Sequence, residues 1–351
     1  MTPDGEQQIF AELVGRRRGP GLAGILGILG AVLLGFAAMS FVAANWQEMS
    51  RLLRLSIIFA GLLGSYAAAA LLFERRMDAF AHAAVLLGVA VFGAGIMLIA
   101  QMYHIDGRPP FAVLVWALGG LGAGVLLRSN PALGASALAF GLWSGWESVL
   151  ANRAHLPFLL PLAGIGAMFL AERWRPGLHV VGALAAAWIV WLGYIENHGH
   201  LHWLVALIGL AASAALVAAL EKAPDANLFG ADVRAVAPPA LGYAMVAAFA
   251  GSFAMQFIEN PALPELVLLA AVTMGLLLGG IVYGVRAGLR AIVWLGYTGF
   301  SAEILSLYFN TVGTLLGSSV FFLVAGLIVI ALAGLAWRLH RAEELRQGAV
   351  P

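Results

Sequence analysis

The stretch AFAHAAVLLGVAVFGAGIMLIAQMY (residues 79–103) contains no Asp, Glu, Lys or Arg. It exceeds the roughly 20 residues that an α-helix needs to cross the hydrocarbon core of a bilayer. Backbone amides in lipid must be paired within the spanning structure, and the stretch lacks the polar and apolar alternation of a barrel strand. It therefore predicts a transmembrane helix, and this prediction decides the fold class.

Similar apolar runs follow one another along the chain. Hydrophobic residues make up 62% of the 351 residues and charged residues 11%, which is typical of a protein surrounded mostly by lipid. We expect an all-α, polytopic integral membrane bundle of about twelve transmembrane helices. The predicted spans are residues 20–45, 52–73, 79–103, 110–127, 131–150, 155–171, 178–195, 201–220, 236–257, 264–285, 288–309 and 315–337.

The basic residues fall in alternate gaps between these spans. Of the 19 Lys and Arg residues, only Arg51, Arg54, Arg108 and Arg153 lie on the side opposite to the N-terminus. Cytoplasmic loops of membrane proteins carry an excess of Lys and Arg, so this division predicts that both chain termini are cytoplasmic.

The gaps between the spans leave no room for a soluble domain. The chain contains no cysteine, which excludes disulfides and thiolate chemistry. The basic residues form no continuous patch, which argues against nucleic acid as a partner. No cofactor is indicated, and the predicted surroundings are the lipid bilayer. The predicted organisation is a cytoplasmic arm (1–19), a first membrane region (20–150), the remaining membrane helices (151–337) and a cytoplasmic tail (338–351).

Two kinds of internal regularity are present. The hexapeptide IVWLGY occurs at residues 189–194 and again at 292–297, which suggests parallel four-helix repeat units or a chance repeat in a chain of few residue types. Glycines also recur at four-residue spacing, which favours close helix packing, with association of two copies as the alternative. These glycine pairs are Gly120 and Gly124, Gly275 and Gly279, and Gly280 and Gly284.

Polar and aromatic residues collect at the helix ends that are predicted to face outward. Such residues serve either as ordinary interfacial anchors or as a site for a solute at that face. The candidates are Asn45, Trp46, Gln101, Tyr103, His104 and Glu147.

Glu303 differs from these residues in its depth. It lies 13 residues after Arg290, which places it about 20 Å into its span at the helical rise per residue. A carboxylate at that depth is costly unless it is protonated, paired or in contact with water, and such a group is a functional candidate by default. A neutral Glu that only packs inside the bundle, against Tyr297, Ser301 or Ser306, is the alternative.

The segment HGHLH (residues 198–202) is a candidate metal site. Imidazole and carboxylate groups suit zinc, copper or nickel. A polar loop that merely joins two helices explains the same residues. The predicted ligands are Glu196, His198, His200 and His202.

Several short stretches carry a resemblance to a known family. They are FVAANW (41–46), GIMLIAQMYHIDG (95–107) and LVWAL (114–118). With these motifs, roughly residues 20–150 resemble a family of bacterial integral membrane proteins known only as a domain of unknown function. The resemblance implies a multi-pass protein of the bacterial inner membrane and brings no biochemical activity with it.

Three functions fit these observations. Transport of a small solute or ion is favoured, with Glu303 binding a proton or cation and with Gln101, Tyr103 and His104 at the outer vestibule. The second is an envelope assembly or sensing protein that binds a partner at its outer face. The third is a membrane enzyme acting on a lipid-linked substrate, with Glu147 or Glu303 as acid or base. The sequence leaves all three open, and it carries no phosphate-binding motif that would favour the enzyme.

Overall fold

The computed structural model describes residues 48–195, 201–228, 231–259 and 261–311, together with positions 323, 326, 327 and 330. The predicted span at 20–45, and all but four positions of the one at 315–337, lie outside the described residues. The chain divides into two compact units, Met1–Leu63 and Gly64–Pro351.

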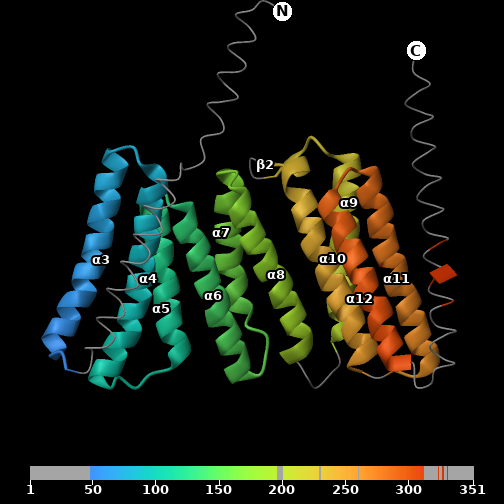
Figure 1. The fold of residues 1–351 in the computed structure, drawn as a ribbon, viewed down its shortest axis with the longest axis horizontal. Coiled ribbons are helices and arrows are strands. Elements are labelled where there is room, and N and C mark those ends of the chain that lie inside the picture. Colours follow the sequence, from blue (N-terminus) through green and yellow to red (C-terminus); the bar gives the residue numbers. More distant parts are fainter. Residues whose placement is uncertain are drawn as a thin grey trace, which may run out of the picture. The chain divides into compact units, whose positions relative to one another are not determined.

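Each of the ten predicted spans between residues 52 and 309 coincides with helix (Figure 1). Eight of the described helices are long and apolar enough to cross a membrane. The two exceptions are α6, which is less apolar, and α7, which is short. The predicted count of about twelve and the cytoplasmic placement of both termini therefore stay predictions. The helices are α3 Arg51–Glu74, α4 Asp78–Tyr103, α5 Pro109–Leu126, α6 Asn130–Ala151, η1 Leu156–Phe158, α7 Leu159–Ala171, α8 Arg175–Ile195, α9 His202–Lys222, α10 Val233–Phe257, α11 Leu263–Arg286 and α12 Arg290–Thr311.

Two short strands interrupt the all-α pattern of the described residues. β1 (Asn227–Leu228) and β2 (Ala231–Asp232) pair antiparallel in the loop between α9 and α10, which is the longest of the predicted gaps. They pair only two residues each, so the loop is a small hairpin on a helical protein.

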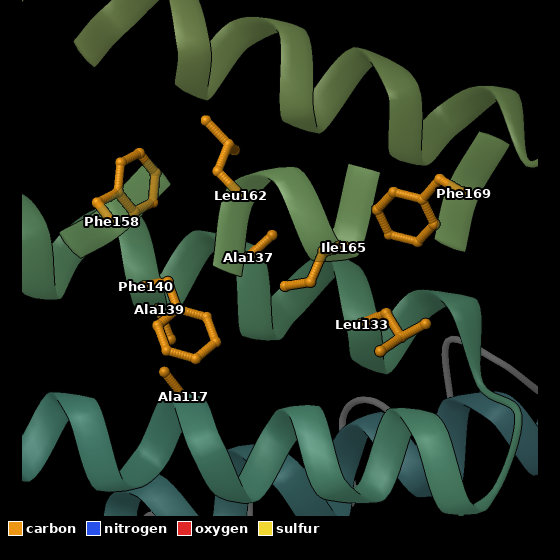
Figure 2. Packing of buried hydrophobic residues seen from close by; sticks show 9 residues of the cluster. All are labelled: Ala117, Leu133, Ala137, Ala139, Phe140, Phe158, Leu162, Ile165 and Phe169. Atoms are coloured by element: carbon orange, nitrogen blue, oxygen red, sulfur yellow. The ribbon is translucent and has the colours of Figure 1, made fainter. Parts of the chain in front are cut away.

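An apolar core joins α5, α6, α7 and α8. Phe140 of α6, Phe158 of η1 and Phe169 of α7 are buried together (Figure 2). Gly124 lets α6 approach α5, because a Cβ on that glycine would lie 2.7 Å from the Leu133 side chain. The predicted glycine pair Gly120 and Gly124 therefore serves helix packing within the chain.

A second group of helices, α9 to α12, packs on the other side of α8, which contacts α6 and α7 as well as α9 and α10 (Figure 1). The backbones of α9 and α10 touch. A Cβ on Gly209 would lie 2.3 Å from the Ala248 amide nitrogen, and a Cβ on Gly251 would lie 2.4 Å from that of Ala206. No side chain fits at either point, so these two glycines fix the separation of α9 and α10.

Four turns at one end of the helices share a left-handed cap. Arg76, Arg128, Arg173 and Gly288 have φ between 48° and 68°, and after each of them an amide donates to the carbonyl five residues back. This is the hydrogen-bond pattern that ends a helix and satisfies its last carbonyls. These turns join α3 to α4, α5 to α6, α7 to α8 and α11 to α12.

The two IVWLGY copies occupy different positions in their helices. Residues 189–194 lie near the end of α8, whereas residues 292–297 lie near the start of α12. Helices related by an internal repeat would carry the motif at equivalent positions, so the structure gives no support to four-helix repeat units. At Gly275 and Gly279, an added Cβ would have no described atom within 4 Å.

Candidate functional site

Glu303 lies inside the packing of α10, α11 and α12. Its exposed fraction is 0%. Gly296 and Gly299, on the same helix, allow close contact with α11, because a Cβ at either position would meet Leu277 or Ile281. Small residues thus bring α11 against α12 and leave the carboxyl enclosed.

The polar neighbour of Glu303 is Gln256 of α10, whose side chain interacts with the carboxyl group. Gln256 is 3% exposed. Its Nε2 donates to the Ser252 carbonyl at 3.2 Å and to the Thr273 hydroxyl oxygen at 3.0 Å. Among the described residues, neither Glu303 oxygen nor the Gln256 Oε1 has a hydrogen-bond partner of standard geometry. Three buried acceptor atoms therefore lack a donor at one place.

Two of the three other neighbours expected from the sequence, Tyr297 and Ser301, turn away from Glu303. Tyr297 is half-exposed, and the Ser301 hydroxyl donates to the Tyr297 carbonyl at 2.9 Å. Both residues lie on the exposed side of α12. The buried partner comes from α10, which is distant in the sequence, and therefore periodicity within α12 could not identify it.

The hydrogen bond between Gln256 and Thr273 also shows how far along α10 and α11 this site lies. Gln256 is next to the last residue of α10, whereas Thr273 lies ten residues into α11, or about 15 Å along that helix. The end of α10 is therefore recessed relative to the start of α11. Residues 258–262 connect the two levels, a distance that five residues of chain can cover at roughly 3.3 Å per residue.

A second polar pair lies at the recessed end of α10. His202, the first residue of α9, approaches Glu259 with Nδ1 and Oε1 2.6 Å apart. The side chains are 10% and 22% exposed. Glu259 follows Gln256 by three residues and lies two residues beyond the end of α10. The sequence singled out His202 as a metal ligand and did not predict its pairing with Glu259.

The exposed fraction of the side chains decreases from Glu259 through His202 and Gln256 to Glu303. Glu259 reaches solvent, His202 does so slightly, Gln256 is almost enclosed and Glu303 is fully enclosed. Thr273 is buried and donates its hydroxyl to the Leu269 carbonyl at 2.9 Å. A polar residue inside an apolar span was the signal that could have identified Thr273 from the sequence.

Glu147 lies in a different part of the protein from Glu303. It pairs with Arg108, with Nη2 and Oε2 2.6 Å apart, and the Arg108 side chain is 68% exposed. Both residues line a cavity of about 670 Å³ at the ends of α5, α6 and η1, together with Arg153 and His155. Burial lowers the pKa of His155 below its usual value of 6.5, while Glu147 acts in the opposite direction. The His155 ring meets Trp143 edge-on at 4.5 Å.

Gln101, Tyr103 and His104 form the end of α4 and are exposed. His104 takes the left-handed cap position with φ 49°. They are thus at a helix end, as the sequence indicates, and the described contacts do not join them to Glu303. Asn45 and Trp46 lie outside the described residues.

Of the four predicted metal ligands, Glu196, His198 and His200 lie outside the described residues. The fourth, His202, contacts Glu259. Within the described part of the chain, no group of three or more His, Asp or Glu side chains is arranged to hold a metal ion.

Residues 1–133 match a family model described as "Predicted membrane protein (DUF2157)". This match confirms the resemblance seen in the motifs, and it covers the N-terminal part of the chain through α5 and the first four residues of α6. No curated protein and no solved structure matches the chain. The matched region ends well before α9, so Glu303, Gln256 and the pair His202–Glu259 lie outside it.

Proposed function

We propose that this multi-pass membrane protein transports a small solute or ion and that Glu303 is its coupling residue. The observation that carries the proposal is a fully buried carboxyl group in an apolar helix long enough to span a membrane, with no standard hydrogen bond among the described residues. A group that only packs a bundle would be replaced at little cost by an apolar residue of similar volume. A group that must bind and release an ion cannot be replaced in that way.

In this proposal, the described conformation is a closed state. Glu303 has no exposed surface, and the cavities at the ends of α5 and α6 and along α11 are lined by other residues. Transport then requires a second arrangement of α10, α11 and α12 in which Glu303 meets water. The small residues between α11 and α12 favour such a movement, because they make a smooth interface.

The proposal also gives a role to the residues at the outer face of the protein. With both termini cytoplasmic and the protein in the bacterial inner membrane, the ends of α4, α6, α8 and α10 face outward. Gln101, Tyr103, His104 and Glu147 then lie at the outer entrance, where their hydrogen-bonding groups would meet a polar solute first.

The test is uptake into proteoliposomes. Pools of small solutes and cations are offered to vesicles that contain the parent protein, with and without a pH gradient, and the accumulated species are identified. Glu303→Gln keeps the shape of the side chain and removes the ionisable group. We expect uptake by the parent protein and a loss of its dependence on the gradient in Glu303→Gln.

Glu265→Gln is the matched control, because Glu265 is an exposed carboxylate in the first turn of α11. It should transport as the parent does. Equal gradient-dependent uptake by the parent and by Glu303→Gln would refute the coupling role. The absence of uptake of every species offered to the parent would favour the assembly or sensing function instead.

A further inference from the structure

We infer that a groove between α9 and α11 holds one phospholipid whose headgroup carries a primary ammonium group, with an acyl chain in the apolar part of the groove. This site goes beyond the proposed function, because a lipid can bind there whether or not Glu303 couples transport. Three observations carry the inference: the residues that line the groove, its length, and the two opposite charges at its mouth.

The groove forms because α9 and α11 both pack against α10. Leu241 and Met245 of α10 lie at its floor and are 2% and 5% exposed. On one wall, Leu210 of α9 is 43% exposed. On the other wall, Gly279 of α11 is exposed, and a Cβ there would have no described atom within 4 Å. A groove with a buried floor and exposed walls opens sideways, which for membrane-spanning helices means toward lipid.

The groove consists of two adjoining cavities, an inner one of about 300 Å³ and an outer one of about 680 Å³, and Gly279 and Tyr283 line both. The inner cavity is otherwise lined by apolar residues, glycine and Ser213. The Ser213 hydroxyl donates to the Gly209 carbonyl at 2.8 Å, so it is satisfied within α9. A polar solute in the inner cavity would lose its hydrogen bonds to water without replacement, whereas an acyl chain has none to lose.

The length of the groove matches one leaflet of a bilayer. Along α11, ten residues separate Leu276 in the inner cavity from Arg286 in the outer one, which is about 15 Å at the helical rise per residue. Half of the hydrocarbon core of a bilayer is also about 15 Å thick. The outer cavity lies at the ends of α9 and α11. A lipid with its headgroup in the outer cavity would therefore extend an acyl chain along the groove toward the middle of the bilayer.

The outer cavity is lined by two charged residues, Glu221 near the end of α9 and Arg286 at the end of α11. Within the described part of the chain, neither residue forms an ion pair, and the two do not pair with each other. Opposite charges that line one cavity without meeting suit a ligand that carries both charges. A guanidinium group binds phosphate through charge-assisted hydrogen bonds, and a carboxylate accepts such bonds from an ammonium group.

These two charges discriminate between phospholipid headgroups. Phosphatidylethanolamine carries a phosphate for Arg286 and an ammonium group with N–H donors for Glu221. Phosphatidylglycerol carries the phosphate alone, and Glu221 would repel its net negative charge. Phosphatidylcholine carries a cation without an N–H, so Glu221 cannot accept a hydrogen bond from it. We therefore expect phosphatidylethanolamine to bind more tightly than either of the other two lipids.

Native mass spectrometry of the full-length protein tests the site. The protein in detergent is mixed with equal amounts of phosphatidylethanolamine, phosphatidylglycerol and phosphatidylcholine that carry the same acyl chains, and the bound lipids are identified by their mass. We expect one phosphatidylethanolamine per chain as the preferred species. Gly279→Leu places a side chain in the open space of the groove and should abolish this binding.

Two further variants test the headgroup separately from the acyl chain. Arg286→Gln should weaken the binding of phosphatidylethanolamine about tenfold, as expected for the loss of one charge-assisted hydrogen bond. Glu221→Gln should remove the preference, so that phosphatidylethanolamine and phosphatidylglycerol bind equally. Both residues are exposed, so neither change disturbs the packing of the helices.

Gly164→Leu in α7 is the matched control, because Gly164 is also exposed and its Cβ would have no described atom within 4 Å. It should bind lipid as the parent does, and circular dichroism of all variants should show the parent helix content. Equal lipid binding by Gly279→Leu and Gly164→Leu, or no bound lipid in the parent, would refute the groove as a lipid site. A parent that binds phosphatidylglycerol or phosphatidylcholine as well as phosphatidylethanolamine would refute the assigned headgroup. None of these results bears on the coupling role of Glu303.

Discussion

At the scale of single residues, the surroundings give three carboxylates of this chain different roles. Glu147 pairs with an arginine that is mostly exposed, and such surface pairs contribute roughly 0–1 kcal/mol to stability. Glu259 is paired with the His202 imidazole at the edge of the helix packing. Glu303 has a neutral amide as its neighbour and no exposed surface. Only Glu303 therefore requires a proton or a conformational change to satisfy its oxygens.

His155 provides a prediction about pH. Burial lowers the pKa of this imidazole in the folded protein below the value of 6.5, so the unfolded chain binds more protons than the folded one as the pH falls below about 6.5. The contribution of His155 to stability is fully present above that pH and is lost below it. We expect the thermal unfolding midpoint of the parent to fall more than that of His155→Phe between a pH of about 7.5 and one of about 5.5.

Phe keeps the edge-on ring contact with Trp143 and does not titrate, so the comparison isolates the imidazole at position 155. The measurement is the difference between the two midpoints as a function of pH. An identical pH dependence of the two proteins would show that burial of His155 is not linked to stability.

At the scale of helices, the sequence predicted where each described span lies and could not predict which spans touch. Long apolar runs between basic turns fix the positions of α3 to α12, because backbone pairing in lipid leaves few alternatives to a helix. The partners of buried polar groups depend on helix packing. Gln256 and Glu303 are separated by a whole helix in the sequence. The glycines that bring α11 against α12 beside Glu303, Gly296 and Gly299, present no distinctive pattern in the sequence.

The contact of α9 with α10 provides a prediction at this scale. A methyl group on Gly251 would lie 2.4 Å from the Ala206 amide nitrogen and 2.8 Å from the His202 carbonyl, and backbone atoms cannot move aside as a flexible side chain can. Gly251→Ala should therefore lower the thermal unfolding midpoint, by the equivalent of about 1–3 kcal/mol for an overpacked interface. It should also separate His202 from Glu259.

Gly145→Ala in α6 is the control, because its Cβ would have nothing within 4 Å. Its midpoint should equal or slightly exceed that of the parent, since alanine favours the helix over glycine by up to about 1 kcal/mol. Equal midpoints for Gly251→Ala and Gly145→Ala would contradict the close approach of α9 and α10.

At the scale of the whole molecule, the orientation in the membrane decides which end of the helices is the entrance. The charge division predicts that the turn between α4 and α5 is external and that the turn between α9 and α10 is cytoplasmic. Gly107 and Ala223 are exposed in these two turns, and the chain has no cysteine of its own.

Labelling with a membrane-impermeant thiol reagent tests this orientation. In intact cells, Gly107→Cys should react and Ala223→Cys should not, whereas both should react after the membrane is opened. The reverse result in intact cells would invert the orientation and would move the pair His202–Glu259 to the cytoplasmic face.

Transport coupled through Glu303 requires that this residue, although fully enclosed in the described state, meets water on both sides of the membrane in turn. Glu303→Cys in this cysteine-free chain tests it directly, with a small water-soluble thiol reagent added to either side of oriented proteoliposomes. Ala137→Cys is the control, because Ala137 is 1% exposed in the core of α5, α6 and α7, which no step of transport opens. We predict that position 303 is labelled slowly from each side and that position 137 is labelled from neither. Protection of position 303 from both sides, at the level of position 137, would contradict the account and leave Glu303 as a packing residue.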